Sequence, residues 1–220
     1  MLTRRHFIAT SAALFSTPIA SPVLASTWPT ASQIAAWDAQ VTPANFDLET
    51  SNPWGLQPRF LPRRVEARAG LTPGDIHVDA VARYLYHIEE GGKAMRYGVA
   101  IARGNLYEPG TYTIRRKVEW PHWTPTKSMI ERNPEYAQFE DGQEPGPTNP
   151  LGSRALYLFV GQRDTYLRIH GSPQSRSIGG RASSGCVRMV MAHINELYPK
   201  VAIGSTAYLY SAEDSVTARS

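Results

Sequence analysis

The 220-residue sequence contains a single cysteine, Cys186, so it cannot form an internal disulfide. Exported proteins usually pair their cysteines or lack them, because a free thiol outside the cytoplasm is open to oxidation. A lone cysteine is therefore buried and inert, bonded to another molecule, or kept for the reactivity of its thiol. The three interpretations imply different functions, so the residues around Cys186 carry most of the functional information in the sequence.

The sequence also lacks a long apolar run and a strong charge of either sign. No segment approaches eighteen consecutive apolar residues, so no membrane-spanning helix is expected. Lysine and arginine number 23 against 19 acidic residues, and two of the arginines lie in the first 25 residues. The remaining balance of 21 to 19 gives no reason to expect a nucleic-acid partner, since phosphate binding requires many positive charges.

Residues 1–25 resemble a cleaved export signal. Arg4 and Arg5 form a charged start, a mildly apolar stretch follows, and Val23-Leu24-Ala25 resembles a small-residue cleavage site. The run TRRHFI is similar to a twin-arginine export signal, although the general export route stays open. An uncleaved anchor or a disordered tail is the alternative interpretation.

The rest of the chain divides into three segments. Residues 26–66 show no sustained hydrophobic period, so we expect an N-terminal extension that wraps along the surface of the main domain. Residues 67–211 form that domain, and residues 212–220 form a tail. Four arginines near the end of the extension are interpreted as a solvated face: Arg59, Arg63, Arg64 and Arg68.

Alternation of apolar and polar residues predicts a mainly β domain. Residues 76–101 indicate consecutive strands of a β-meander with one buried face. Further strands are expected over residues 110–120, 155–161, 165–171 and 206–211, and a short amphipathic helix over residues 190–201. The pattern favours a β-sandwich or β-barrel with one small helix after Cys186.

Residues 120–153 interrupt this pattern with six prolines and several aromatic residues. A loop of this length inside a compact domain is usually functional or disordered. Its aromatic content argues against disorder. We therefore expect an ordered lid or pocket wall.

A reactive cysteine needs a base, and histidine is the natural candidate near neutral pH. Five histidines follow the expected signal: His77, His87, His122, His170 and His193. The first two lie on predicted strands, and His122 could line a pocket. His193 lies seven residues after Cys186 on the predicted helix, about 10 Å along its axis, which is too far for proton transfer. His170 ends a predicted strand, so it is the best candidate.

The residues around Cys186 favour a reactive thiol. Gly185 allows the backbone to turn tightly. We expect this turn to precede a helix, which would leave unpaired amides for an oxyanion and would lower the pKa of the thiol. Arg188 would favour the thiolate and hold a substrate carboxylate, or alternatively form a structural ion pair.

The stretch IHGSPQSRSIGGRASSGCVRM, residues 169–189, closely resembles the active-site signature of the L,D-transpeptidases of the YkuD family. That signature is a His-Gly-Thr/Ser segment, a loop, and then Ser-x-Gly-Cys-Ile/Val-Arg-Met. The resemblance extends over residues 70–210 through three upstream blocks in the right order: EWPHWTPTKSMIERNPE, GPTNPLGSRALYLF and TYLRIHGS.

The resemblance implies that Cys186 is the nucleophile, that His170 is the base, and that the carbonyl of Gly171 orients the imidazole. Many family members have histidine where this chain has Ser184, and many others have serine. The serine removes a rival base and leaves its own role open. The substrate-binding residues that we expect from the resemblance and the local sequence are Ser172, Ser183, Ser184, Gly185 and Arg188.

The resemblance implies an L,D-transpeptidase that acts on peptidoglycan stem tetrapeptides through a thioester on Cys186. The acyl acceptor would be another stem peptide, which gives 3-3 cross-links, or an outer-membrane protein. With water as the acceptor, the enzyme would be an L,D-carboxypeptidase or endopeptidase. A non-catalytic cell-wall-binding module and a thiol redox protein are the alternatives from other classes.

The same resemblance implies a periplasmic location at the cell wall and acylation of Cys186 by carbapenems. No cofactor is expected, because no step of this chemistry requires one. No metal is expected either, because no cluster of histidine, cysteine and acidic residues has the spacing of zinc ligands.

Overall fold

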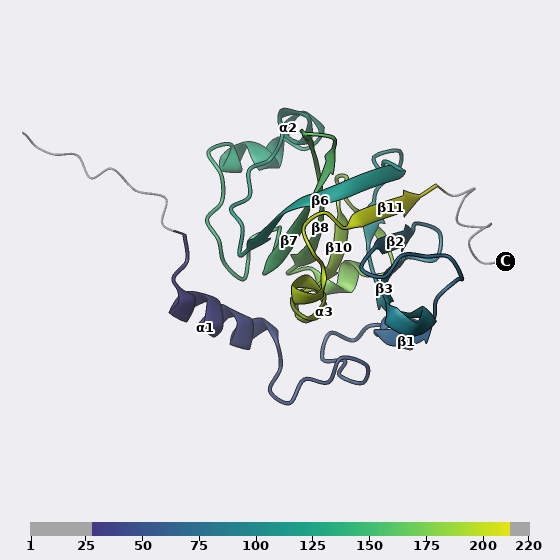
Figure 1. Ribbon diagram of the computed structural model, residues 1–220. Helices are drawn as coiled ribbons and strands as arrows, with labels where there is room; N and C mark the ends of the chain where they lie inside the picture. Colours follow the sequence, from purple (N-terminus) through teal and green to yellow (C-terminus); the bar gives the residue numbers. More distant parts are fainter. Residues whose placement is uncertain (1–27, 212–220) are drawn as a thin grey trace, which may run out of the picture.

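The computed structural model describes residues 28–211 as a curved nine-stranded sheet with a few short helices (Figure 1). The strands of this sheet follow the order β1-β4-β3-β2-β11-β6-β7-β8-β10, and β5 and β9 form a separate two-stranded sheet. Two pairs in the nine-stranded sheet, β2 with β11 and β8 with β10, are parallel, and the others are antiparallel. The mainly β fold expected from the sequence is therefore confirmed.

The strands are β1 Arg63–Glu66, β2 Ile76–Asp79, β3 Tyr84–Glu89, β4 Lys93–Gly98, β5 Ile101–Ala102, β6 Gly110–Glu119, β7 Arg154–Val160, β8 Arg163–Ser172, β9 Arg181–Ser183, β10 Val187–Val190 and β11 Thr206–Tyr210. The α-helices are α1 Ala31–Val41, α2 Lys127–Arg132 and α3 Met191–Leu197. The 3₁₀ helices are η1 Pro58–Phe60, η2 Glu90–Gly92, η3 Pro134–Phe139, η4 Ser175–Ser177 and η5 Tyr198–Lys200.

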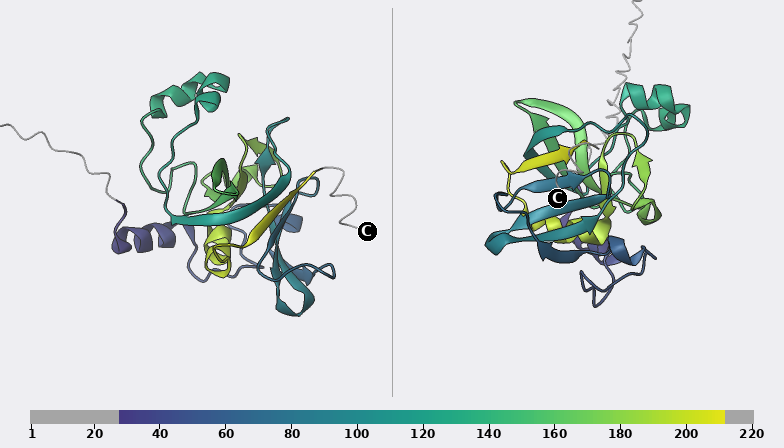
Figure 2. Two further views of the ribbon diagram at one scale, coloured as in Figure 1. Left: turned by 45° about the horizontal axis from the view of Figure 1, so that its top comes forward. Right: turned by 90° about the vertical axis from the view of Figure 1, so that its right-hand side faces the viewer.

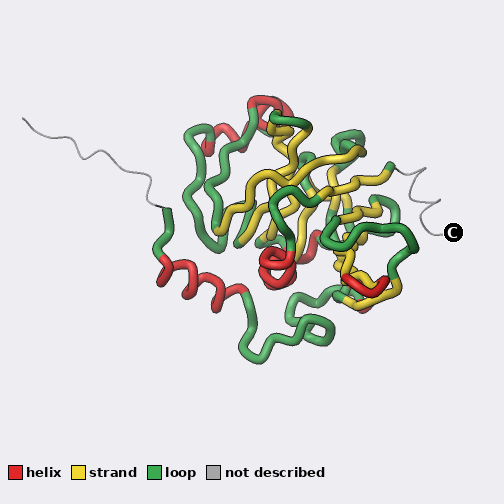
Figure 3. Tube along the Cα trace, viewed as in Figure 1, coloured by secondary structure: helices red, strands yellow, loops and turns green. Residues whose placement is uncertain are grey.

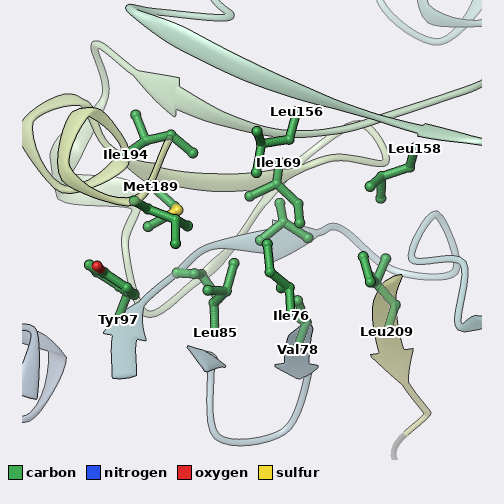
Figure 4. Close-up of a cluster of buried hydrophobic side chains, with 14 of the residues drawn as sticks. Ile76, Val78, Leu85, Tyr97, Leu156, Leu158, Ile169, Met189, Ile194 and Leu209 are labelled. Atoms are coloured by element: carbon green, nitrogen blue, oxygen red, sulfur yellow. The ribbon is translucent and has the colours of Figure 1, made fainter. Parts of the chain in front are cut away.

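The core lies between two parts of the curved sheet, one formed by β2, β3 and β4 and the other by β7, β8 and β10 (Figure 4). Leu156 of β7, Ile169 of β8 and Met189 of β10 face Ile76 and Leu85 from β2 and β3. All five side chains are at most 3% exposed. Burial of this apolar surface, at about 25 cal/mol per Å², is the main force that holds the two parts together.

The predicted meander is formed by β2, β3 and β4, which are neighbours in sequence and in the sheet. The expectation of a single buried face is wrong for β2, because all four of its residues are buried. Its outer face carries His77, whose ring is covered by the stacked ring of Tyr208 at a centroid distance of 4.6 Å.

The helix expected after Cys186 is confirmed as α3, in which five of seven residues are buried. The helix α1 in the N-terminal extension was not expected. Thr30 and Gln33 form a capping box at its start. The helix has no buried residue, which explains why hydrophobic periodicity did not indicate it. The extension also contributes the edge strand β1, which pairs with β4.

The segment 120–153 rises from the sheet as an ordered arm that carries α2 and η3 (Figure 2). Loops lead to and from these short helices (Figure 3). None of the helices formed by residues 28–211 has the length and apolar character needed to cross a bilayer. The expected signal and tail, residues 1–25 and 212–220, lie outside the described residues.

Candidate active site

His170 lies on β8, and Cys186 lies directly before β10, the strand that pairs with β8 in parallel. In the register of β10 and β8, Arg188 lies beside His170 and Val187 beside Ile169. Cys186 directly precedes Val187, the first residue of β10. Because side chains alternate along an extended chain, we infer that Cys186 lies on the same side of the sheet as Arg188. The apolar members of both strands enter the core, so the polar members share the opposite face.

That face forms the floor of a cavity of about 890 Å³. Its walls come from the arm 120–153 and from the loops around β8 and β10. The expectation that the arm forms a pocket wall is confirmed, and His122 is one of its lining residues. Seven of the eight site residues expected from the sequence line the cavity: His170, Ser172, Ser183, Ser184, Gly185, Cys186 and Arg188.

The ring of His170 is fixed from one side. The residue is 4% exposed, and its Nδ1 lies 2.5 Å from the carbonyl oxygen of Gly171. That distance assigns the proton of the neutral ring to Nδ1, which leaves Nε2 as an acceptor. Burial, and then the guanidinium of Arg188, lower the pKa of His170 to about 3. At neutral pH the ring is therefore uncharged, and Nε2 carries no proton.

Gly171, the eighth expected residue, acts through its backbone. Its carbonyl is the acceptor for His170, and Gly152 lies against the same peptide group. A Cβ atom on Gly152 would lie 2.7 Å from the carbonyl carbon of Gly171. On the other side, a Cβ on Gly171 itself would lie 3.0 Å from Cγ of Met191 in α3. Glycine at both positions permits this close packing, which fixes the acceptor of the histidine.

The thiol of Cys186 is half-buried and lies 3.8 Å from the carbonyl oxygen of Tyr166. Burial raises the pKa of Cys186, while the backbone amide of Arg168 and the guanidinium groups of Arg168 and Arg188 lower it. The expectation of a lowered pKa at a helix start is wrong. The turn leads into strand β10, and α3 begins only at Met191, so the thiol does not lie at the start of that helix.

Arg168 was not singled out from the sequence, although it is the charged group that acts most strongly on the pKa of the thiol. Its side chain is buried, forms two hydrogen bonds with Asp164 at 2.6 and 2.8 Å, and stacks on the ring of Tyr157 at 3.8 Å. The alternation of apolar and polar residues in β8 is the feature of the sequence that could have indicated Arg168. Leu167 and Ile169 enter the core, so Arg168 faces the cavity with His170.

Arg188 reaches into the cavity without a carboxylate partner. Its Nη1 donates to the side-chain oxygen of Gln174 at 2.9 Å, and its Nε is buried without a partner among residues 28–211. None of the ion pairs between these residues includes Arg188, so the alternative of a structural ion pair is not observed there. The guanidinium has free donors for an anionic ligand.

The turn before Cys186 is shaped by Ser183 and Gly185. The hydroxyl of Ser183 donates to the carbonyl of Cys186 and accepts from the amide of Gly185 at 3.4 Å. Gly185 has a φ of 148°, in the region that favours glycine, and a Cβ there would lie 3.3 Å from Leu167. Ser184 is half-buried in the cavity wall, and the hydroxyl of Ser172 accepts from the amide of Gln174 at 3.2 Å.

The family model of the L,D-transpeptidase catalytic domain, YkuD, matches residues 73–209. This chain belongs to the YkuD family. The match runs from before β2 into β11 and includes both Cys186 and His170.

Curated relatives carry the same family name. The product of ORF 5 in the ATP synthase subunits region of Fuscovulum blasticum, named as an L,D-transpeptidase, is 35% identical over 58% of this chain and 64% of that protein. The "Probable L,D-transpeptidase YbiS" of Escherichia coli K12 is 28% identical over 74% of this chain. The chain spans 52% of the length of that second relative.

Solved structures give partial matches. A Brucella melitensis protein, described as a probable carnitine operon oxidoreductase, is 46% identical over 70% of this chain and 96% of that chain, with a TM-score of 0.49. An Enterococcus faecium L,D-transpeptidase is 16% identical over 64% of this chain and 50% of its own, also with a TM-score of 0.49.

Proposed function

We propose that this YkuD-family chain is an L,D-transpeptidase that uses Cys186 as its nucleophile and peptidoglycan stem tetrapeptides as acyl donors. One observation carries the proposal: Cys186, directly before β10, and His170, on the adjacent parallel strand β8, line the same cavity. A thiol beside a neutral, fixed imidazole is the arrangement required for nucleophilic acyl transfer.

The first step is acylation of the sulfur. The thiol turns from the carbonyl of Tyr166 toward Nε2 of His170 and gives up its proton as the sulfur attacks the carbonyl carbon of stem residue three. A carbon–sulfur bond forms, and the bond to the amine of D-alanine four breaks. His170 returns the proton to the departing amine, which leaves a thioester on Cys186.

The structure supports this step in two ways. The ring of His170 is neutral before the reaction, and the carbonyl of Gly171 holds its Nδ1 proton, so the lone pair of Nε2 carries no proton. The cations of Arg168 and Arg188 offset part of the burial that disfavours the thiolate. The free donors of Arg188 are placed to bind a carboxylate of the stem peptide, and the amides of the Ser184–Cys186 turn are the candidates for holding the oxyanion.

The second step transfers the acyl group. An amine enters the cavity, loses a proton to His170 and attacks the thioester. A carbon–nitrogen bond forms and the carbon–sulfur bond breaks, and the proton on His170 returns to the sulfur. The acceptor amine belongs to a second stem peptide, which gives a 3-3 cross-link, or to an outer-membrane protein. The arm 120–153 reduces competition from water because it walls the cavity with aromatic groups such as Trp123 and Tyr136.

A protein with this substrate works at the cell wall. We propose that the chain is exported through the signal expected in residues 1–25 and acts in the periplasm. Fusion of residues 1–66 to a reporter that is active only after export tests this location. Loss of export in the Arg4→Lys and Arg5→Lys double variant would indicate the twin-arginine route.

Incubation of the purified protein with disaccharide tetrapeptides tests the proposed activity. Cross-linked dimers with release of D-alanine are the expected result, and the Cys186→Ala protein should yield none. Free tripeptides without dimers would instead identify an L,D-carboxypeptidase. An unchanged substrate, together with a thiol that a carbapenem does not acylate in the intact-mass spectrum, would favour a wall-binding module without catalysis.

A further inference from the structure

The helix α1 holds the base of the arm 120–153, although it lies outside the segment that the family model covers. Asp38 on this helix is the central residue. Its carboxylate accepts two hydrogen bonds from the guanidinium of Arg154, at 2.9 and 2.6 Å. It accepts a third from the indole Nε1 of Trp120 at 3.1 Å. The paired geometry with Arg154 is the strong form of a carboxylate–guanidinium contact.

These two partners mark the two ends of the arm. Trp120 follows β6 where the arm begins, and Arg154 opens β7 where it ends. The amide of Trp120 donates to the carbonyl of Ser153 at 2.7 Å, and Nη1 of Arg154 donates to the same carbonyl at 2.9 Å. Trp37, also on α1, packs its ring 5.2 Å from the ring of Trp120. One helix therefore clamps both ends of the arm at a single point.

The same point leads directly to His170. The hydroxyl of Ser153 donates to Asn195 of α3 at 2.6 Å, and the amide group of Asn195 lies 3.4 Å from Asp38. Next to Ser153, Gly152 packs against the peptide of Gly171, which is the acceptor for His170. Leu151, three positions before Arg154, lines the cavity with His170, and its backbone raises the pKa of the histidine against the effect of burial.

The extension touches the cavity rim at a second place. Trp28 packs edge-on against His122, with ring centroids 5.2 Å apart, and His122 lines the cavity. Trp28 and Trp37 contact the arm and its base, and Asp38 contacts the base of the arm and Asn195 of α3. This first part of the extension is therefore packed against the arm that walls the cavity.

We propose that Asp38 is a positioning residue for His170, which it acts on through Arg154, Trp120 and the backbone of residues 151–153. The carboxylate fixes the junction of the arm, and the junction fixes the two backbone groups that act on the imidazole. The effect on turnover rests on the proposed function. The effect on the reactivity of the thiol does not rest on it, because any electrophile can report that reactivity.

The variant Asp38→Asn tests this role in the full chain. It preserves size but replaces one oxygen that accepts from Arg154 with a donor group. Glu119→Gln is the matched control, because Oε1 of Glu119 also lies near Arg154, 3.8 Å from its Nε. The hydrogen bonds from the side chains of Trp120 and Asn195 go to Asp38 and not to Glu119. For each protein, the rate of Cys186 alkylation by iodoacetamide is measured against pH, together with kcat and KM for the tetrapeptide.

We expect Asp38→Asn to lower kcat about tenfold while KM stays within about twofold, since a displaced base affects chemistry more than binding. Looser packing should also admit water to His170, so the alkylation profile should gain an inflection near the ordinary histidine pKa. Glu119→Gln should match the wild type in all three quantities. Arg154→Lys, which keeps the charge but not the paired contact, should change them in the same direction as Asp38→Asn.

A wild-type kcat and alkylation profile in Asp38→Asn would overturn the positioning role, and so would a loss confined to thermal stability. If Asp38→Asn does not fold, Arg154→Lys supplies the same comparison. A wild type that transfers no acyl group, but whose alkylation profile changes in Asp38→Asn, would contradict the proposed function and leave the positioning role standing.

Discussion

Replacement of Gly152 by alanine tests the contact that holds the active-site histidine in place. Gly152 has a φ of +62°, and a Cβ atom there would lie 2.7 and 2.8 Å from the carbonyl carbon and oxygen of Gly171. Ordinary contacts between such atoms are about 3.5 Å or longer. The Gly171 peptide must therefore move by about 0.8 Å, and with it the acceptor of Nδ1 of His170.

The expected cost has two parts, and a second glycine separates them. Gly161, in the turn between β7 and β8, has a φ of +58°, and a Cβ atom there would have no heavy atom within 4 Å. Gly161→Ala should lower the free energy of unfolding by about 1 kcal/mol, the cost of the left-handed conformation alone. Gly152→Ala should add about 1–3 kcal/mol for the overlap.

The activity should separate the two variants further. A displacement near 1 Å at a catalytic group can reduce the rate about 100-fold, so Gly152→Ala should slow acylation of Cys186 by roughly that factor. Gly161→Ala should keep the wild-type rate. Urea unfolding followed by tryptophan fluorescence gives the stabilities, and intact-mass spectrometry with a carbapenem gives the rates. Equal stabilities and equal rates for the two variants would refute the proposed role of the Gly152–Gly171 contact.

Two other perturbations have defined outcomes. Arg168→Met removes the cation that lowers the pKa of the Cys186 thiol most strongly, so the thiol pKa should rise and the alkylation profile should shift to higher pH. Arg116→Met, which also removes a guanidinium stacked on Tyr157, should leave the profile unchanged. His170 and His193 each have a folded pKa of about 3 against 6.5 unfolded, so below pH 6.5 the unfolded chain binds more protons. As the pH falls below 6.5, the free energy of unfolding should therefore decrease by about 1.4 kcal/mol per pH unit for each histidine. In His193→Phe, whose ring would lie among Phe46, Trp54 and Tyr97, the contribution of His193 to this decrease should be absent. Urea titrations at pH 7 and pH 5 measure the difference. An unchanged pH dependence in His193→Phe would contradict the burial argument.

The strands could be predicted because alternation reflects burial directly. In β8 and β10, Ile169 and Met189 enter the core while His170 and Arg188 face the cavity. A period of two in the sequence therefore sorts core residues from site residues. The order of the strands could not be obtained this way, because β11 lies between β2 and β6 through contacts far apart in the chain.

The surroundings of Cys186 were harder to predict because they depend on tertiary contacts. The apolar run after Cys186 contains both β10 and α3, and periodicity does not show where the strand ends and the helix begins. The pKa of the thiol follows from burial and from Arg168 on the neighbouring strand, neither of which is visible in the local sequence. The effect of Asp38 on the arm is of the same kind, since Asp38 and Arg154 are 116 residues apart.

In the proposed reaction, Cys186 carries the acyl group of the substrate. Intact-mass and peptide mass spectrometry of the protein quenched during incubation with disaccharide tetrapeptide test it most directly. We expect a disaccharide-tripeptide adduct on the peptide that contains Cys186, and a much slower appearance of that adduct in His170→Ala. D-Alanine release from a protein with no adduct on Cys186, or at an undiminished rate in Cys186→Ala, would contradict it.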